Sequence, residues 1–213
     1  GRATPSHSTL SVDGFSSSRL SAARAGQPEY LTDRAETAAP RLSQGPDGLH
    51  LSCGHSGWRA THGLTHARDL WLSRDGRRLR GEETLGAASP PDCRRFEAVL
   101  AQAGPAGLRF AVRFHLHPDV DAALDMGGAA VSMALKSGEI WVFRPDPGAQ
   151  LALEPSVYLE KGRLKPRAAR QIVLHAHATK AATIIGWTLA KAQDTPLAIR
   201  DTERDELPLP ARA

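Results

Sequence analysis

Alternation of apolar and polar side chains is clearest between residues 108 and 118, which read Leu-Arg-Phe-Ala-Val-Arg-Phe-His-Leu-His-Pro. Successive side chains of a strand point to opposite faces, so every second residue shares a face. One face is apolar and carries Phe110, Val112, Phe114 and Leu116. The other carries Arg113, His115 and His117. It is either a solvated surface or the lining of a groove for an acidic ligand, since Arg donates paired hydrogen bonds to carboxylate or sulfate.

Shorter runs of the same kind recur along the chain, separated by residues typical of tight turns. Examples are Asp13-Gly14, Gly45-Pro46-Asp47-Gly48 and Arg74-Asp75-Gly76, where Gly and Pro suit positions that need positive or fixed φ. The runs predicted as strands are 7–12, 41–44, 49–54, 64–73, 77–85, 108–118, 120–125, 129–136, 139–144, 150–160, 171–179 and 182–190.

Two segments interrupt this rhythm. Residues 15–40 are rich in Ser, Ala and Arg with little periodicity, so we predict an irregular excursion with a helical turn near 18–24. Residues 93–103 place apolar side chains at helical spacing and are followed by Gly104-Pro105, which predicts a short helix. That helix either covers an opening as a lid or packs against the sheet.

Roughly a dozen strands with frequent turns and little helix predict an all-β fold, an antiparallel β-sandwich with one short helical insertion. The chain of 213 residues is long enough for one good core. We expect one domain over residues 1–192. Residues 193–213 carry alternating charges, two prolines and few apolar side chains, so a polar, loosely ordered tail is expected there.

Composition excludes several functions. The formal net charge is +4, and no dense basic run with interleaved aromatics is present, so no nucleic-acid partner is expected. No apolar run is long enough to span a membrane. Cys53 and Cys93 have no metal or redox spacing, and neither a Gly-x-Ser-x-Gly motif nor a Gly-rich phosphate loop occurs. The opening residues lack the apolar region of a signal peptide, and we expect a fragment of a longer protein.

Three stretches resemble the heparinase II/III-like polysaccharide lyases. The segment from Arg2 to Gly14 is similar to that family's Arg-x-Thr-x-x-His-Asn-Thr segment, with Ser8 in place of the Asn. Gly54-His55-Ser56-Gly57-Trp58 and the later His66-Ala67-Arg68 resemble its His-x-Gly-aromatic and His-x-Arg strand pair. Phe114-His115-Leu116-His117-Pro118 resembles a later strand. Order and spacing agree over residues 1–190 or so.

The resemblance implies a C-terminal β-sandwich that packs against an N-terminal α/α-toroid domain outside this chain. Such lyases cleave acidic, uronate-containing glycans such as glycosaminoglycans by β-elimination: a base removes the proton α to the carboxylate, an acid protonates the leaving oxygen, and nearby donors stabilise the developing charge. In the family most catalytic residues lie on the toroid. We therefore name no catalytic residue, expect this chain alone to be inactive, and expect a periplasmic parent protein. The alternative is a non-catalytic carbohydrate-binding or scaffolding domain.

Candidate site residues follow from the same resemblance. His7 matches a His that binds structural zinc in some members, so the full-length protein is a candidate zinc protein. Zinc needs at least three protein ligands, and the alternative is a hydrogen-bonded His at a domain interface. His55 and Trp58 either form a sugar-stacking platform or belong to a tight turn around Gly57 with a partly buried Trp.

The remaining candidates lie on two predicted strands. His66 and Arg68 contact substrate or the missing domain, or form a cross-strand ion pair with Glu82 or Glu83. Arg113, His115 and His117 complete the predicted substrate-binding set. His175 and His177 repeat the same spacing and are expected on an exposed face.

Overall fold

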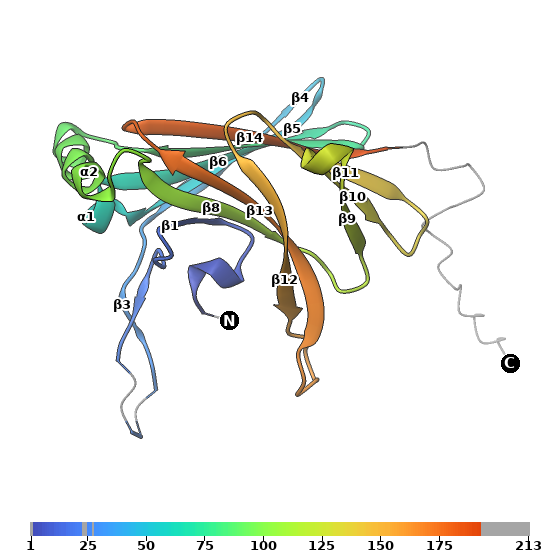
Figure 1. The fold of residues 1–213 in the computed structure, drawn as a ribbon, viewed down its shortest axis with the longest axis horizontal. Helices are drawn as coiled ribbons and strands as arrows, with labels where there is room; N and C mark the ends of the chain where they lie inside the picture. Colours follow the sequence, from blue (N-terminus) through green and yellow to red (C-terminus); the bar gives the residue numbers. More distant parts are fainter. Residues whose placement is uncertain (1, 23–24, 27, 193–213) are drawn as a thin grey trace, which may run out of the picture.

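The computed structural model describes residues 2–22, 25–26 and 28–192, which form a β-sandwich of two antiparallel sheets (Figure 1). In spatial order, the large sheet contains β4 (Thr37–Gly45), β5 (Gly48–Trp58), β6 (Leu64–Ser73), β7 (Arg78–Gly86), β14 (Ala182–Lys191), β11 (Ile140–Pro145), β10 (Ala130–Ala134) and β9 (Asp121–Asp125). The small sheet contains β1 (Leu10–Val12), β8 (Leu108–His115), β13 (Arg167–Ala178) and β12 (Gln150–Tyr158). The predicted all-β sandwich is confirmed.

The core lies between the two sheets and is built by period-two alternation. On β8, Phe110 is 4% exposed and Val112 is fully buried. Phe114 contacts the Trp187 ring of β14 at a centroid distance of 4.8 Å, which joins the small sheet to the large one. Burying each such side chain stabilises the fold by about 1.5–3 kcal/mol relative to exposure. The apolar face predicted for residues 108–118 is therefore confirmed.

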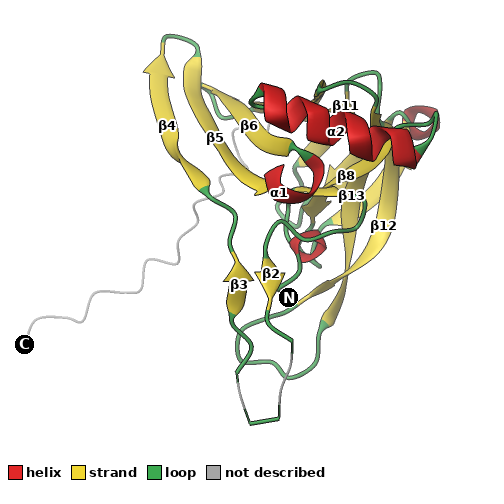
Figure 2. Cartoon of the chain, turned by 90° about the vertical axis from the view of Figure 1, so that its left-hand side faces the viewer, coloured by secondary structure: helices red, strands yellow, loops and turns green. Residues whose placement is uncertain are grey.

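The predicted helix exists as α2 (Pro90–Ala103), which lies at one end of the sandwich beside the short α1 (Arg59–His62) (Figure 2). Ser89 caps α2 by accepting a hydrogen bond from the Asp92 backbone N–H at 3.4 Å, and Pro90 suits the first turn. Phe96 is only 1% exposed. The helix is therefore a packing element, which decides between the two alternatives.

The prediction for residues 15–40 is wrong. Arg19–Leu20 (β2) and Leu31–Asp33 (β3) pair as a two-stranded sheet, and β4 already starts at Thr37. This β2–β3 arm is held by contacts between distant residues, such as the Ser21 N–H donating to the Tyr30 carbonyl at 2.8 Å. No local alternation of apolar and polar residues predicts such pairing. Residues 23–24 of the expected helical turn lie outside the described part.

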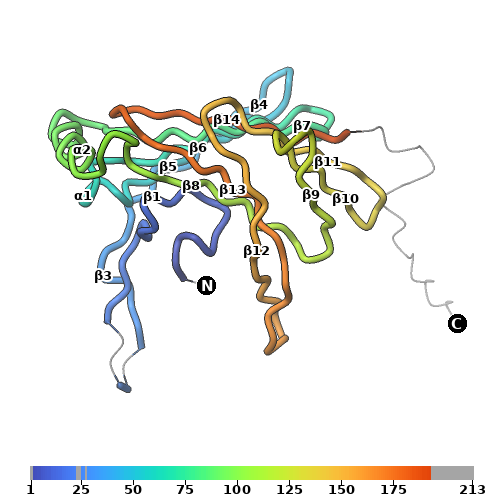
Figure 3. Tube along the Cα trace, in the orientation of Figure 1, coloured from blue at the N-terminus to red at the C-terminus, as the bar shows by residue number. Residues whose placement is uncertain are grey.

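The arm and the β12–β13 hairpin extend from the same side of the molecule (Figure 3). Between them lies the N-terminal segment, with its 3-10 turn η1 (Thr4–Ser6). A second 3-10 turn, η2 (Met126–Gly128), joins β9 to β10. No helix within the described ranges is long and apolar enough to cross a membrane. The tail expected at 193–213 falls outside them.

Candidate ligand-binding cavity

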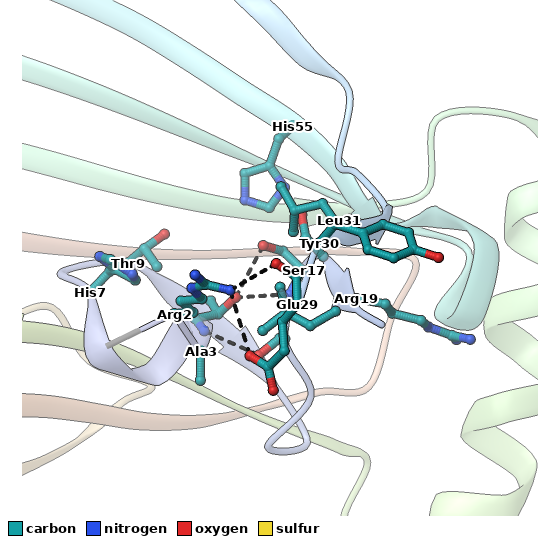
Figure 4. A pocket seen from close by; sticks show the side chains of 14 residues that line it. Arg2, Ala3, His7, Thr9, Ser17, Arg19, Glu29, Tyr30, Leu31 and His55 are labelled. Carbon is teal, nitrogen blue, oxygen red and sulfur yellow. Dashed lines mark hydrogen bonds and ion pairs between the residues drawn. The ribbon is translucent and has the colours of Figure 1, made fainter. Parts of the chain in front are cut away.

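An open cavity of about 1020 Å³ lies between the N-terminal segment, the β2–β3 arm and β5 (Figure 4). Three stretches of chain supply its lining, which includes Arg2, His7 and Thr9 from the first, Arg19, Glu29 and Tyr30 from the arm, and His55 from β5. Figure 4 shows His7 and Arg2 on one side beneath His55, with Tyr30 and Arg19 on the other side. The lining therefore combines charged and polar side chains with apolar ones.

The N-terminal wall of the cavity is fixed by hydrogen bonds. The buried Thr4 accepts at Oγ1 from the Ser17 N–H at 2.9 Å. The carbonyl of Pro5 accepts from His115 Nε2 at 3.0 Å. Because that nitrogen donates, His115 Nδ1 accepts from the Ser156 hydroxyl at 2.8 Å. His115 therefore anchors the wall, and neither of its nitrogens is left for a ligand.

Arg2 and Glu29 join the N-terminal segment to the arm. The Arg2 Nη1 atom lies 3.5 Å from Glu29 Oε2 and 3.3 Å from the Glu29 carbonyl oxygen. The two side chains are 64% and 43% exposed. An exposed pair of this kind is weak, so the Arg2 guanidinium remains available to an anionic ligand.

A chain of hydrogen bonds runs from His55 into the core. The Gly57 N–H donates to His55 Nδ1 at 3.1 Å, so the His55 proton resides on Nε2, which lies 3.4 Å from His66 Nδ1. Because His66 Nδ1 accepts this hydrogen bond, the His66 proton resides on Nε2, which donates to Glu83 Oε2 at 2.6 Å. One tautomer of each imidazole satisfies all three contacts.

The other Glu83 oxygen is equally well held. Oε1 accepts from Arg68 Nε at 2.7 Å and from Trp187 Nε1 at 3.2 Å. Glu83 is 1% exposed and His66 is 4% exposed. Arg68 also donates from Nη1 to the Ser8 carbonyl at 2.8 Å, which ties the buried carboxylate to the N-terminal segment. The cross-strand ion pair predicted as an alternative for Arg68 is present, with Glu83 as partner.

His55 is neutral where it borders the cavity. Burial and the neighbouring His66 lower the pKa of His55 to about 4. Both of its nitrogens are already bonded, so it presents ring carbon rather than a free nitrogen to a ligand. Its predicted role as a hydrogen-bonding partner for sugar hydroxyls therefore does not fit this conformation.

The sugar-stacking role predicted for Trp58 does not fit either, because its side chain is fully buried. The indole packs at 5.1 Å from the His55 ring and 6.4 Å from the His66 ring. Gly57 allows β5 to approach the chain just before β2, since a Cβ at this position would lie 2.5 Å from Ser17 Cβ. The tight turn expected around Gly57 is not observed, because Gly57 belongs to β5, where the pairing with β6 shifts register between His55 and Trp58. Trp58 is fully buried, not partly buried as that alternative had it.

Arg113 and His117 lie away from this cavity, as does His115. Arg113 lines a small cup together with Arg109 and His175, and His115 lines a different groove beside Ser156. His117 follows β8, where its Nδ1 accepts from the Asp119 N–H at 3.2 Å. The polar face of the 108–118 strand thus exists, but it does not form one groove with His7 and His55.

His7 is the exposed imidazole of the cavity. Within the described ranges its ring takes part in no hydrogen bond, and no three His, Cys, Asp or Glu side chains gather as a metal site. The residues present therefore do not form a complete zinc site around His7. Sequence patterns did not identify several contributors, namely Arg2, Arg19, Glu29 and Tyr30 in the cavity and Trp187 beside Glu83, because no local pattern links them to the predicted residues.

A family profile, a curated protein and several solved structures match this chain. A family profile described as Heparinase II/III-like, C-terminal matches residues 1–188. FtsZ-localized protein C of Caulobacter vibrioides is 34% identical over 195 residues, covering 90% of this chain and 32% of that protein. Heparan sulfate lyase HepC from Pedobacter heparinus superposes with a TM-score of 0.63 at 14% identity, over 92% of this chain and 26% of that one.

A further solved structure, described as the Heparinase III-BT4657 gene product, has a TM-score of 0.61 at 10% identity and covers 91% of this chain and 25% of that one. At such identities the likeness shows the fold alone. The chain spans about a third of the curated relative and about a quarter of the solved lyases.

Proposed function

Because the chain belongs to the heparinase II/III-like family as its C-terminal domain, we propose that it is the β-sandwich part of a polysaccharide lyase-like protein that acts on acidic glycans by β-elimination. In this proposal the domain supplies one wall of the glycan site. Most catalytic residues reside on an N-terminal α/α-toroid domain in the rest of the protein.

The cavity beneath His55 is the observation that carries the proposal. Its described lining holds the cations Arg2 and Arg19 and the exposed His7, but only one carboxylate, Glu29. A uronate carboxylate entering this cavity meets guanidinium donors, and a guanidinium beside the reacting carboxylate stabilises the charge that develops during proton abstraction. His7, whose ring forms no hydrogen bond with the described residues, is the group best placed to contact the glycan or pass a proton.

The buried network supports this role indirectly. Glu83 orients His66 and Arg68, and Arg68 holds the Ser8 carbonyl next to His7. The cavity wall is thereby preorganised, which spares a bound polymer the entropic cost of ordering it. His66 and Arg68 act here by positioning the wall and not by touching the glycan.

The test uses the longer natural protein, incubated with uronate-containing polysaccharides while the absorbance of the unsaturated product is followed. We expect product from the full-length protein, and a decrease of roughly tenfold or more for Arg2→Ala or His7→Ala. His177→Ala, an exposed imidazole outside the cavity, serves as the control and should behave like wild type. Glycan binding without product would contradict the lyase proposal.

A non-catalytic scaffolding role is the second candidate. It is favoured by the 34% identity to FtsZ-localized protein C over 90% of this chain, since that relative carries no lyase name. Under this candidate the domain recruits a protein to sites where FtsZ assembles. Colocalisation of a fluorescent fusion with FtsZ, together with absence of unsaturated product, supports this role over lyase activity.

Periplasmic location, expected from the family, is part of the lyase proposal. A fusion of the full-length protein to a reporter that is active only in the periplasm tests it. Reporter activity supports the proposal, and its absence in cells that make the fusion contradicts it.

A further inference from the structure

A cup of about 260 Å³ opens on the outer face of the small sheet, separate from the cavity beneath His55. Ala111 lies at its centre: the strand register pairs Ala111 with Ser11 on β1 and with His175 on β13. Arg109 and Arg113 lie two residues to either side of Ala111 on the same face of β8. The small Ala111 side chain leaves the space between these four longer ones unfilled.

The cup carries a guanidinium that no carboxylate compensates. Arg113 donates from Nη1 to Ser11 Oγ at 2.7 Å, which fixes its plane, and no Asp or Glu in the described part of the chain forms an ion pair with it. Arg109 pairs with Asp13 at 3.2 Å, but these side chains are 76% and 37% exposed. Such a pair is weak and exchanges readily for a better anion.

His175 borders the cup from β13. Its Nε2 atom lies 2.9 Å from Glu154 Oε1, and both side chains are partly exposed. Among the described residues that line the cup, two guanidinium groups, those of Arg109 and Arg113, therefore lie beside a single carboxylate, Asp13. Guanidinium groups in this arrangement donate two parallel hydrogen bonds to one oxyanion.

The cup and the cavity are joined by one stretch of chain. His7 and Thr9 line the cavity, and Ser11 and Asp13 line the cup. Two residues of extended chain span only about 7 Å, so a flexible linear polymer that occupies the cavity can reach the cup.

We propose that this cup binds an oxyanion group, sulfate or carboxylate, of the same acidic glycan, with Arg113 as its principal donor and Arg109 and Ser11 beside it. The inference rests on the proposed function for the identity of the polymer. The oxyanion chemistry rests on the cup alone. Sulfate and uronate carboxylate share this chemistry, and the two sources are separated below.

The experiment measures binding of the full-length protein to a sulfated uronate oligosaccharide, its desulfated form and a neutral oligosaccharide by calorimetry. Arg113→Gln should weaken binding of a charged form about tenfold, because one charge-assisted hydrogen bond is worth that much. Arg41→Gln, an equal change of charge on β4 of the other sheet, is the matched control. Loss confined to the sulfated form assigns sulfate, and an equal loss for both charged forms assigns carboxylate.

A second variant tests whether a loss of binding comes from the cup and not from misfolding. Ala111→Leu keeps every charge and fills the cup, so it should weaken binding as Arg113→Gln does while thermal unfolding shows both variants folded. If Arg113→Gln and Ala111→Leu bind the charged oligosaccharides as tightly as the Arg41→Gln control does, the cup is not an oxyanion site. If the cup variants bind like the control but Arg2→Ala still lowers product formation, the cup is rejected and the proposed function is retained. If inorganic sulfate shifts the NMR signals of Arg113 but the protein binds none of the glycans, the cup is an oxyanion site and the proposed function is rejected.

Discussion

His66 Nε2 lies 2.6 Å from Glu83 Oε2, and both side chains are almost completely buried between the two sheets. This pair places a carboxylate in the core, where an unpaired charge is costly. Arg68 and Trp187 satisfy the second oxygen. The group links the large sheet to the N-terminal wall of the cavity, so its integrity decides whether the cavity has its shape.

Replacing Glu83 by Gln should be strongly destabilising. The substitution leaves Arg68 largely buried without its carboxylate, and breaking such a pair costs about 3–5 kcal/mol. Chemical denaturation of the variant measures this loss of unfolding free energy. Glu82→Gln, on the opposite face of the same strand where it pairs with the exposed Arg80, is the control and should change stability by only about 0.5 kcal/mol. Equal effects of the two changes would contradict the assigned network.

Gly81 makes room for the indole that reaches Glu83. A Cβ at this position would lie 2.2 Å from ring carbons of Trp187, so Gly81→Ala should displace the ring and cost about 1–3 kcal/mol. Tryptophan fluorescence should change with it. At Gly45 a Cβ meets nothing within 4 Å, so Gly45→Ala should leave both stability and fluorescence close to wild type.

Stability should fall as the pH drops from about 6.5 to about 4. The folded-state pKa of His55 is lowered to about 4 from 6.5, so within this window the unfolded chain binds the extra proton. Below the folded pKa the cost is complete, and above 6.5 it vanishes. We expect a loss on the order of 1–2 kcal/mol, discounted because the ring borders an open cavity.

His55→Gln should flatten that pH dependence in denaturation curves. His62, whose pKa is also lowered by burial, acts in the same direction, so a residual slope is expected. A His55→Gln variant with the full wild-type slope would show that His55 is not the titrating group.

His115→Ala should loosen the N-terminal wall. Loss of the contacts to Pro5 and Ser156 removes two hydrogen bonds of about 1 kcal/mol each. Hydrogen exchange of amides in residues 3–9 should accelerate, while that of β12 and β13 stays slow. His177→Ala removes an exposed imidazole from the same sheet and should leave the exchange unchanged.

Local patterns sufficed for much of the fold. The alternation of Phe110, Val112 and Phe114 predicted a strand with a buried face, and the turn residues predicted the hairpins, because both signals depend on neighbours in sequence. The helix at Phe96 followed from its spacing in the same way. The β2–β3 arm could not be predicted, since Ser21 and Tyr30, nine residues apart, meet through a backbone hydrogen bond that no local alternation indicates.

The candidate site, like the fold, could be predicted only in part. The sequence by itself determined which residue types were present and on which strand face each would lie, so the pairing of Arg68 with Glu83 was among the expected alternatives. Only the tertiary structure decided that Trp58 is buried, that His55 is bonded at both nitrogens, and that Arg113 lies in a separate cup. Those outcomes depend on which segments pack over a strand, and packing between residues distant in the chain leaves no periodic trace in the sequence.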